Sequence, residues 1–129
     1  MPVKKAGKKP KDFHAVYDEL KKLMAPYAKG TLKANETAID FQLIGPPAPL
    51  TKGRDMWFGA VRLGKAYVSY HLMPVYAFPD LLDGISPELK KRMQGKSCFN
   101  FTAIDKPLFA ELKRLTKAGY ERFRKEALV

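Results

Sequence analysis

The spacing of the hydrophobic positions changes several times along this chain, and each change predicts a different element. Over residues 12–27 apolar side chains recur every three or four positions, which is the spacing of an amphipathic helix. Asp12 is a suitable N-cap, and Pro26 and Gly30 end the pattern. Over residues 38–44 apolar and polar side chains alternate. This alternation predicts a strand or a strand pair.

The middle of the chain predicts a β-hairpin. Residues 56–63 and 66–73 are rich in aromatic and β-branched side chains. They flank Gly64-Lys65, in which glycine supplies the special dihedral angles of a tight turn. A two-residue turn places Leu63 opposite Ala66.

The last third of the chain predicts two helices separated by a strand. Ser86 is an N-cap for a helix over residues 86–94, and Gly95 ends that helix as its C′ residue. Residues 97–103 form the next strand, and Asp105 caps a long final helix. The order of elements is therefore helix, antiparallel strands, short helices, strand and long helix.

This order predicts an α+β fold, a two-layer sandwich in which the N- and C-terminal helices pack on one face of an antiparallel sheet. The 129 residues suffice for one domain, with a basic flexible tail at 1–11 and a single domain at 12–129. Gly119 lies inside the last helix, where glycine costs about 1 kcal/mol relative to alanine unless another group packs against it.

Strand alternation predicts which side chains face the helices. The expected core face comprises Trp57, Gly59, Val61, Leu63, Ala66, Val68, Tyr70 and Leu72, with Ile39, Phe41, Leu43, Phe99 and Phe101 on neighbouring strands. The other face comprises Asp40, Gln42, Phe58, Arg62, Tyr67, Ser69, His71, Cys98 and Asn100. An uncovered sheet face is normally polar, but these side chains include groups that can bind or react. We therefore hypothesise that this face is a ligand or partner surface formed by Arg62, Tyr67, Ser69, His71, Cys98 and Asn100.

The charge of the chain favours anionic partners. Lys and Arg number 24 against 13 Asp and Glu, which gives a formal net charge of +11. Such a balance attracts anionic small molecules or, non-specifically, nucleic acid. Lysines in segment 1–11 and basic residues on the last helix supply much of this charge, and both are also typical of solvated surfaces.

The composition also indicates the cellular compartment of the protein. A single cysteine, Cys98, excludes an intramolecular disulfide and suits a reducing cytosol. No apolar run approaches the roughly 20 residues of a membrane span, and the basic N-terminus leads into no apolar segment typical of a secretory signal. We expect a cytoplasmic protein without a membrane partner.

Three specific functions can be tested against the sequence: a thiol-dependent enzyme, a metal site and RNA binding. A thiol-dependent enzyme would use Cys98 activated by His71 across the sheet, but no catalytic signature surrounds the cysteine. His14 and His71 lie on different elements and no CxxC or HxxxH spacing exists, so no metal site or other cofactor is expected. Residues 63–70 match part of an RNA-recognition motif, but the motif's basic residue and one stacking aromatic residue are missing. The helix that this fold requires between its first two strands is also missing. Non-specific nucleic-acid binding stays open.

Three segments of the chain resemble the YdhG-like domain family of small bacterial proteins, most of which have no assigned function. These segments are Phe58-Gly59-Ala60-Val61, Tyr67-Val68-Ser69-Tyr70-His71-Leu72-Met73-Pro74 and Lys90-Lys91-Arg92-Met93-Gln94-Gly95-Lys96-Ser97-Cys98-Phe99-Asn100-Phe101. The resemblance spans residues 12–123 and implies a frataxin-like sandwich.

The same resemblance implies an alternative function, because some relatives are described as frataxin-like intracellular iron chaperones. Frataxin-type iron binding uses an acidic ridge on the first helix and the strand that follows. Here that helix offers Asp12, Asp18 and Glu19 but also Lys11, Lys21 and Lys22, so no iron-binding residue is carried over.

Overall fold

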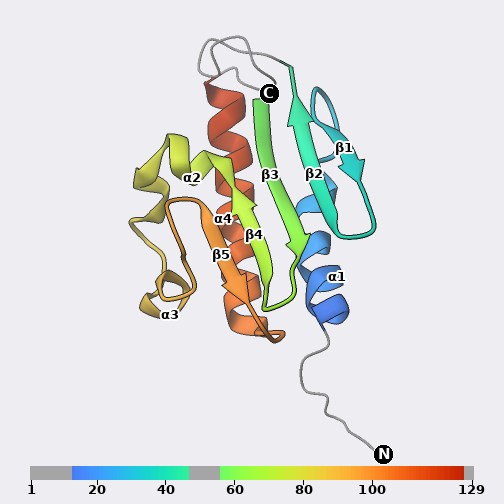
Figure 1. Cartoon of the computed structure of the whole chain (residues 1–129). Coiled ribbons are helices and arrows are strands. Elements are labelled where there is room, and N and C mark those ends of the chain that lie inside the picture. Colours follow the sequence, from blue (N-terminus) through green and yellow to red (C-terminus); the bar gives the residue numbers. More distant parts are fainter. Residues whose placement is uncertain (1–12, 47–55, 127–129) are drawn as a thin grey trace, which may run out of the picture.

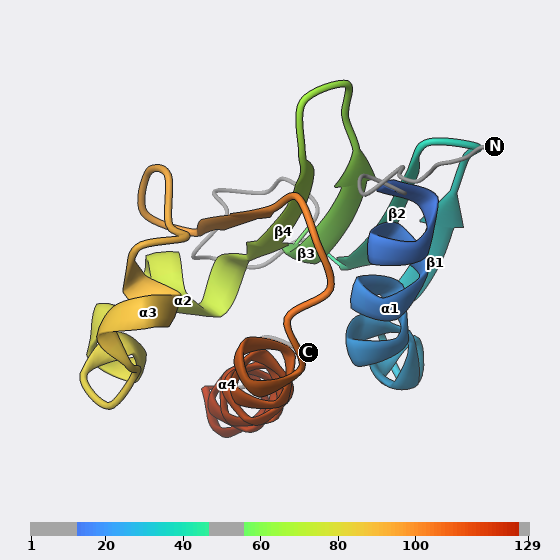
Figure 2. The ribbon, with the colours of Figure 1, turned by 90° about the horizontal axis from the view of Figure 1, so that it is seen from below.

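Five antiparallel strands form one sheet, and the two longest helices lie on one of its faces (Figures 1 and 2). The computed structural model describes residues 13–46 and 56–126. The lysine-rich tail and the expected N-cap Asp12 lie outside these residues. The elements are α1 (Phe13–Met24), the 3-10 helix η1 (Ala25–Tyr27), β1 (Lys33–Glu36), β2 (Asp40–Gly45), β3 (Met56–Leu63), β4 (Val68–Leu72), α2 (Met73–Ala77), the 3-10 helix η3 (Pro79–Leu82), α3 (Pro87–Lys90), β5 (Cys98–Phe101) and α4 (Lys106–Lys125).

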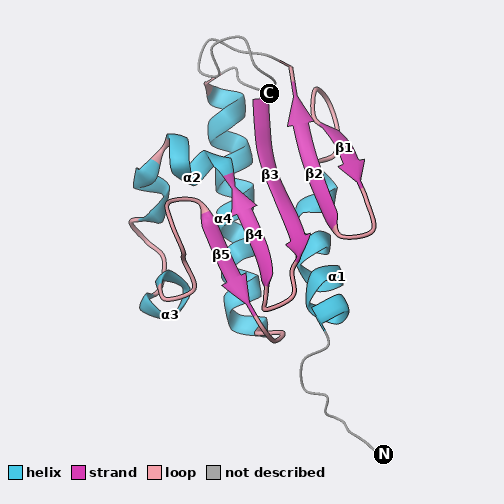
Figure 3. Ribbon diagram, viewed as in Figure 1, coloured by secondary structure: helices cyan, strands magenta, loops and turns pink. Residues whose placement is uncertain are grey.

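The strands follow one another in space in the same order as in the chain, β1-β2-β3-β4-β5. Seen from below, the sheet forms one layer and α1 and α4 form the other (Figure 2). The short helices α2 and α3 lie beyond β4 and β5 at the side of the sheet (Figure 3). The α+β two-layer prediction is therefore confirmed. Figure 1 looks onto the face that α1 and α4 leave uncovered, which we call the open face.

The core lies between the sheet and the apolar stripes of the two helices. α1 buries four side chains and α4 buries a longer stripe that includes Leu112 and Phe123. Val61 and Tyr70 meet these stripes from the centre of the sheet and are fully buried. Each buried Leu or Phe stabilises the fold by about 1.5–3 kcal/mol relative to an exposed one. The Tyr70 hydroxyl bonds to Thr116 on α4, which itself donates to the Leu112 carbonyl, so the polar groups of this contact are satisfied.

Two of the N-caps predicted from the sequence are present. The side chains of Ser86 and Asp105 accept from the main-chain N–H three residues on. Gly95 has a φ of +82° but does not cap a helix, so that part of the prediction was wrong. The helix expected over 86–94 is shorter, because α3 ends at Lys90. Residues 92–94 instead run beside β5: the Gln94 N–H donates to the Cys98 carbonyl, and the Asn100 N–H donates to the Arg92 carbonyl. The expected helix is lost because these main-chain groups cover the outer edge of β5.

The opposite edge of the sheet is formed by β1, which no other described segment covers. β1 pairs with β2 on one side, and no described residue pairs with its other side. All four β1 residues are exposed. The sheet thus has one covered edge and one free edge.

The hairpin register differs from the sequence prediction by two residues. Leu63 pairs with Val68, and the Gly64 N–H donates to the Tyr67 carbonyl, so the two turn residues are Lys65 and Ala66 and not Gly64 and Lys65. Ala66 is consequently exposed in the turn and is not part of the core. Gly64 does not have a positive φ; a Cβ atom there would lie 2.7 Å from the Tyr67 carbonyl oxygen. A shift by two residues leaves every side chain on its predicted face, which is why the face assignments of Leu63 and Val68 survive.

A β-bulge in β3 changes the faces of two other residues. Leu43 pairs with Gly59 and Ile44 pairs with Trp57, so Phe58 is an extra residue between the two pairs. Phe58 is fully buried against Tyr27, Tyr120 and Phe123, whereas Trp57 lies on the open face beside His71. The sequence prediction for Trp57 and Phe58 was wrong, because strict alternation does not hold across a bulge.

Ile39 is the remaining exception to the predicted core. It is 46% exposed because it precedes β2 and belongs to the turn after β1. Its carbonyl accepts from the Leu63 N–H, which brings the β1–β2 turn beside the end of β3.

Gly119 has the close neighbour that its position in a helix required. A Cβ atom at Gly119 would lie 2.8 Å from the Pro74 Cβ and 3.0 Å from its Cγ. The absent side chain therefore lets α2 approach α4.

We expect Gly119→Ala to lower the free energy of unfolding, although alanine is the better helix former by about 1 kcal/mol. The reason is that overpacking against Pro74 costs about 1–3 kcal/mol. Urea unfolding followed by circular dichroism measures the change. Gly84→Ala is the matched control, since nothing lies within 4 Å of a Cβ there. A more stable Gly119→Ala variant would contradict the packing described.

Candidate functional site

The open face brings most of the predicted site residues together in two rows that cross the sheet. One row contains Gln42, Ala60, His71 and Cys98, and the next contains Asp40, Arg62, Ser69 and Asn100. Tyr67 precedes β4 and lies two residues before Ser69, on the side of the second row that is nearer the hairpin turn. Each residue reaches this face because cross-strand partners in an antiparallel sheet point to the same side.

Asn100 is the centre of a hydrogen-bond network on this face. Its side-chain carbonyl accepts from the Ser69 hydroxyl at 3.1 Å and from the Cys98 thiol at 3.3 Å. Its amide group donates to Gln94 Oε1 at 2.6 Å. Ser69, Cys98 and Asn100 are therefore mainly occupied with one another. This network fixes the surface of β4 and β5 beside the more exposed groups.

His71 lies against an aromatic ring. The Trp57 and His71 ring centroids are 5.4 Å apart with an interplanar angle of 44°. The Nδ1 atom of His71 is buried and has no hydrogen-bond partner in the described part of the chain. Burial lowers the pKa of this imidazole below its ordinary value, because the charged form loses solvation.

Cys98 lies opposite His71 across β4 and β5, as the thiol hypothesis required. Burial raises the pKa of the Cys98 thiol, and the neighbouring Ser69 hydroxyl opposes this only in part. The thiol donates to Asn100, and no bond joins it to the imidazole in the described structure. A neutral imidazole beside a protonated thiol is not the arrangement of an activated nucleophile.

A pocket of about 330 Å³ lies at the hairpin end of the open face, and we call it the hairpin pocket. It is lined by Arg62, Gly64, Lys65, Ala66, Tyr67 and Ser69. Neither Arg62 nor Lys65 forms an ion pair with a described residue. Asp40 is the cross-strand neighbour of Arg62, but its carboxylate accepts from Thr37 and from Gln42. Two unpaired cations therefore share one concave surface.

Lys65 was not among the predicted site residues, because its sequence context predicted only a place in the hairpin turn. The signal that could have identified it is its position between Arg62 and Tyr67, at the tip of a hairpin whose adjacent face is polar. Trp57 was also missed, since the bulge that turns it toward His71 leaves no mark in the alternation.

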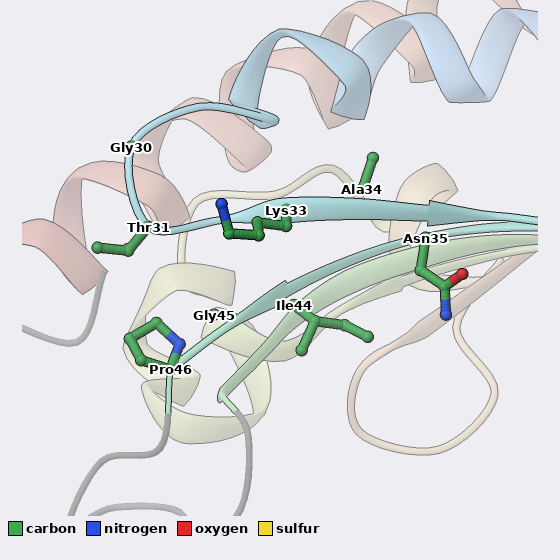
Figure 4. Close-up of a pocket in the computed structure, with 8 residues that line it drawn as sticks. All are labelled: Gly30, Thr31, Lys33, Ala34, Asn35, Ile44, Gly45 and Pro46. Carbon is green, nitrogen blue, oxygen red and sulfur yellow. The ribbon is translucent and has the colours of Figure 1, made fainter.

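A second pocket, of about 540 Å³, lies beside β1 and the end of β2 (Figure 4). It is lined by Gly30, Thr31, Lys33, Ala34, Asn35, Ile44, Gly45 and Pro46. Lys33 is the one ionisable side chain among these residues, and most of the others are small or aliphatic. This pocket is larger than the hairpin pocket but offers fewer groups that could fix the orientation of a ligand.

Two acids in the region expected of an iron site, Glu19 on α1 and Glu36 on β1, are paired with lysines. Glu19 bonds to Lys22 at 2.8 Å, and Lys21 bonds to Glu36 on β1. Across residues 13–46 and 56–126, no three His, Cys, Asp or Glu side chains gather closely enough to hold a metal ion.

Comparison of the chain with protein-family models, with curated proteins and with solved structures found no match. Among the helices of the described ranges, none has the length and apolarity needed to cross a membrane.

We expect Cys98 to react with iodoacetamide at neutral pH no faster than free cysteine does, because burial raises its thiol pKa. Mass spectrometry over a time course measures the rate. The urea-unfolded chain is the control for access to the thiol. A rate above that of free cysteine would restore the thiol-enzyme hypothesis.

We expect His71 to make the fold less stable in mild acid. Its pKa is lowered in the folded state, so the unfolded chain takes up the proton first as the pH falls. The stability linked to this group is present above the ordinary value of 6.5 and is lost as the pH falls from 6.5 to the folded pKa. His71→Phe, which keeps a ring against Trp57, should flatten the loss of stability between about pH 7 and pH 5. His14→Gln, which removes an exposed histidine from α1, is the matched control. Equal slopes in wild type and His71→Phe would refute this assignment.

Proposed function

We propose that this protein is a non-enzymatic binding module whose open face holds an anionic ligand or partner at the hairpin pocket. The observation that carries the proposal is the pair of cations Arg62 and Lys65, which form no ion pair with a described residue and lie beside the hydroxyl-bearing Tyr67 and Ser69. A guanidinium group and an ammonium group that converge on one pocket favour phosphate or carboxylate groups.

The ion pairs of other cations on the surface support the choice of the hairpin pocket as the anion site. Lys21, Lys22 and Arg122 each bond to a carboxylate, so part of their charge is neutralised locally. At the hairpin pocket the cations form no ion pair with a described residue, and the net charge of +11 adds a long-range attraction for anions.

The resemblance to the YdhG-like family belongs to the same proposal. The order of helices and strands and the placement of α1 and α4 on one face are what that resemblance implies. A cytoplasmic location is likewise proposed from the single cysteine. An iron-chaperone function gains no support, because the α1 acid Glu19 is paired with a lysine.

We expect inorganic pyrophosphate to shift the amide NMR signals of residues 62–69 at near-physiological salt. The double variant Arg62→Gln/Lys65→Gln should weaken binding at least about ten-fold, since each charged hydrogen bond is worth about 1.5–3 kcal/mol. Raising the salt concentration should weaken binding by wild type through screening.

The matched control is Lys113→Gln/Lys117→Gln, which removes the same charge from exposed positions on α4. Equal weakening by both double variants would show that only net charge matters. Shifts confined to Lys4, Lys5, Lys8, Lys9 and Lys11 would place anion binding in the tail. Either result would refute the proposed site.

A further inference from the structure

We infer that the hairpin pocket recognises a single nucleotide unit, a phosphate joined to a planar ring, rather than a bare anion or a long strand. This inference rests on the proposed function and names the chemical class of its ligand. It comes from one juxtaposition: the exposed ring of Tyr67 lines the same pocket as Arg62 and Lys65.

The phosphate would lie between the two cations. Arg62 comes from β3, whose paired strands fix its main chain, and Lys65 comes from the turn. A guanidinium group can donate two parallel bonds to phosphate oxygens, and the lysine adds a point charge. The main-chain N–H groups of Lys65 and Ala66 donate to no described atom, so the turn offers two further donors.

The ring would stack on Tyr67. This side chain is 38% exposed, which is high for a large aromatic residue at the wall of a pocket. Stacking of one base on an aromatic side chain contributes about 1–3 kcal/mol and tolerates any base, because each has a π-face. Arg62 lies on β3 and Tyr67 lies between the turn and β4, so a phosphate and a ring can be held at the same time.

The size of the pocket favours one unit. At about 330 Å³ it is near the lower end of the range of roughly 300–1,000 Å³ for small-molecule sites. A bare phosphate would leave most of this volume to water, and a strand would need a continuous groove. One wall is also held in place, because Ser69 donates to Asn100, which donates to Gln94. A wall fixed by such a network needs little reordering when a ligand binds.

The experiment compares four probes by calorimetry and amide NMR: ribose 5-phosphate, adenosine, adenosine 5′-monophosphate and a short mixed-sequence oligonucleotide. We expect adenosine 5′-monophosphate to bind at least about five-fold more tightly than ribose 5-phosphate, which is the lower bound of one stacking interaction. Tyr67→Ala should abolish this difference. Arg62→Gln should weaken both phosphates.

Two variants serve as matched controls. Tyr76→Ala removes the other strongly exposed tyrosine, which is 55% exposed on α2 and is not part of the pocket. Arg124→Gln removes an exposed arginine from α4. Both should bind all probes as wild type does, and circular dichroism confirms that each variant is folded.

The outcomes separate this inference from the proposed function. If the two phosphates bind equally well through Arg62, the anion site stands and the nucleotide inference fails. If neither phosphate shifts residues 62–69, both fail. If the oligonucleotide alone binds tightly and Tyr67→Ala has no effect on the mononucleotide, the ligand is a strand and the inference is overturned.

Discussion

The extra residue at Phe58 decides what each face of the sheet presents. Because β3 contains a bulge, Phe58 packs against Tyr27 and Phe123 on the helix side while its neighbour Trp57 turns to the other side. Gly59 follows with no side chain, and a Cβ atom there would lie 2.6 Å from the Met24 Cε. Because the large side chain of Phe58 is followed by Gly59, which has no side chain, η1, α1 and α4 can all pack close to β3. The same irregularity places an indole ring beside His71 on the open face.

The open face consequently has two regions of different character. Around Trp57 and His71 it is aromatic and partly buried, and its imidazole favours the neutral form. Toward the hairpin it is cationic and exposed, with Arg62 and Lys65 unpaired. The Asn100 network lies between these regions and fixes β4 to β5. In physical terms, the thiol of Cys98, which would be the nucleophile of this face, already donates to Asn100.

Much of the fold could be predicted from the sequence, because helical spacing, caps and alternation are local features. Asp105 and Ser86 cap helices as expected, and the faces of Val61 and Tyr70 follow from alternation. The hairpin register was off by two residues, which moved Ala66 from the core to the turn but left the strand side chains on their predicted faces, since side chains alternate with a period of two. The bulge at Phe58 could not be foreseen, because it depends on how β2 and the helices pack around β3. The candidate site was likewise foreseen as a face but not as a pocket: Lys65 joins it through the shape of the turn.

The two edges of the sheet set a limit on how copies of this chain could join. Residues 92–94 occupy the outer side of β5, whereas the outer side of β1 pairs with no described residue. Growth of a sheet from molecule to molecule needs two free edges on every copy, one for each neighbour. Two copies joined through β1 would present only covered strands to a third. Association by strand pairing would therefore close at a dimer and could not continue into a filament.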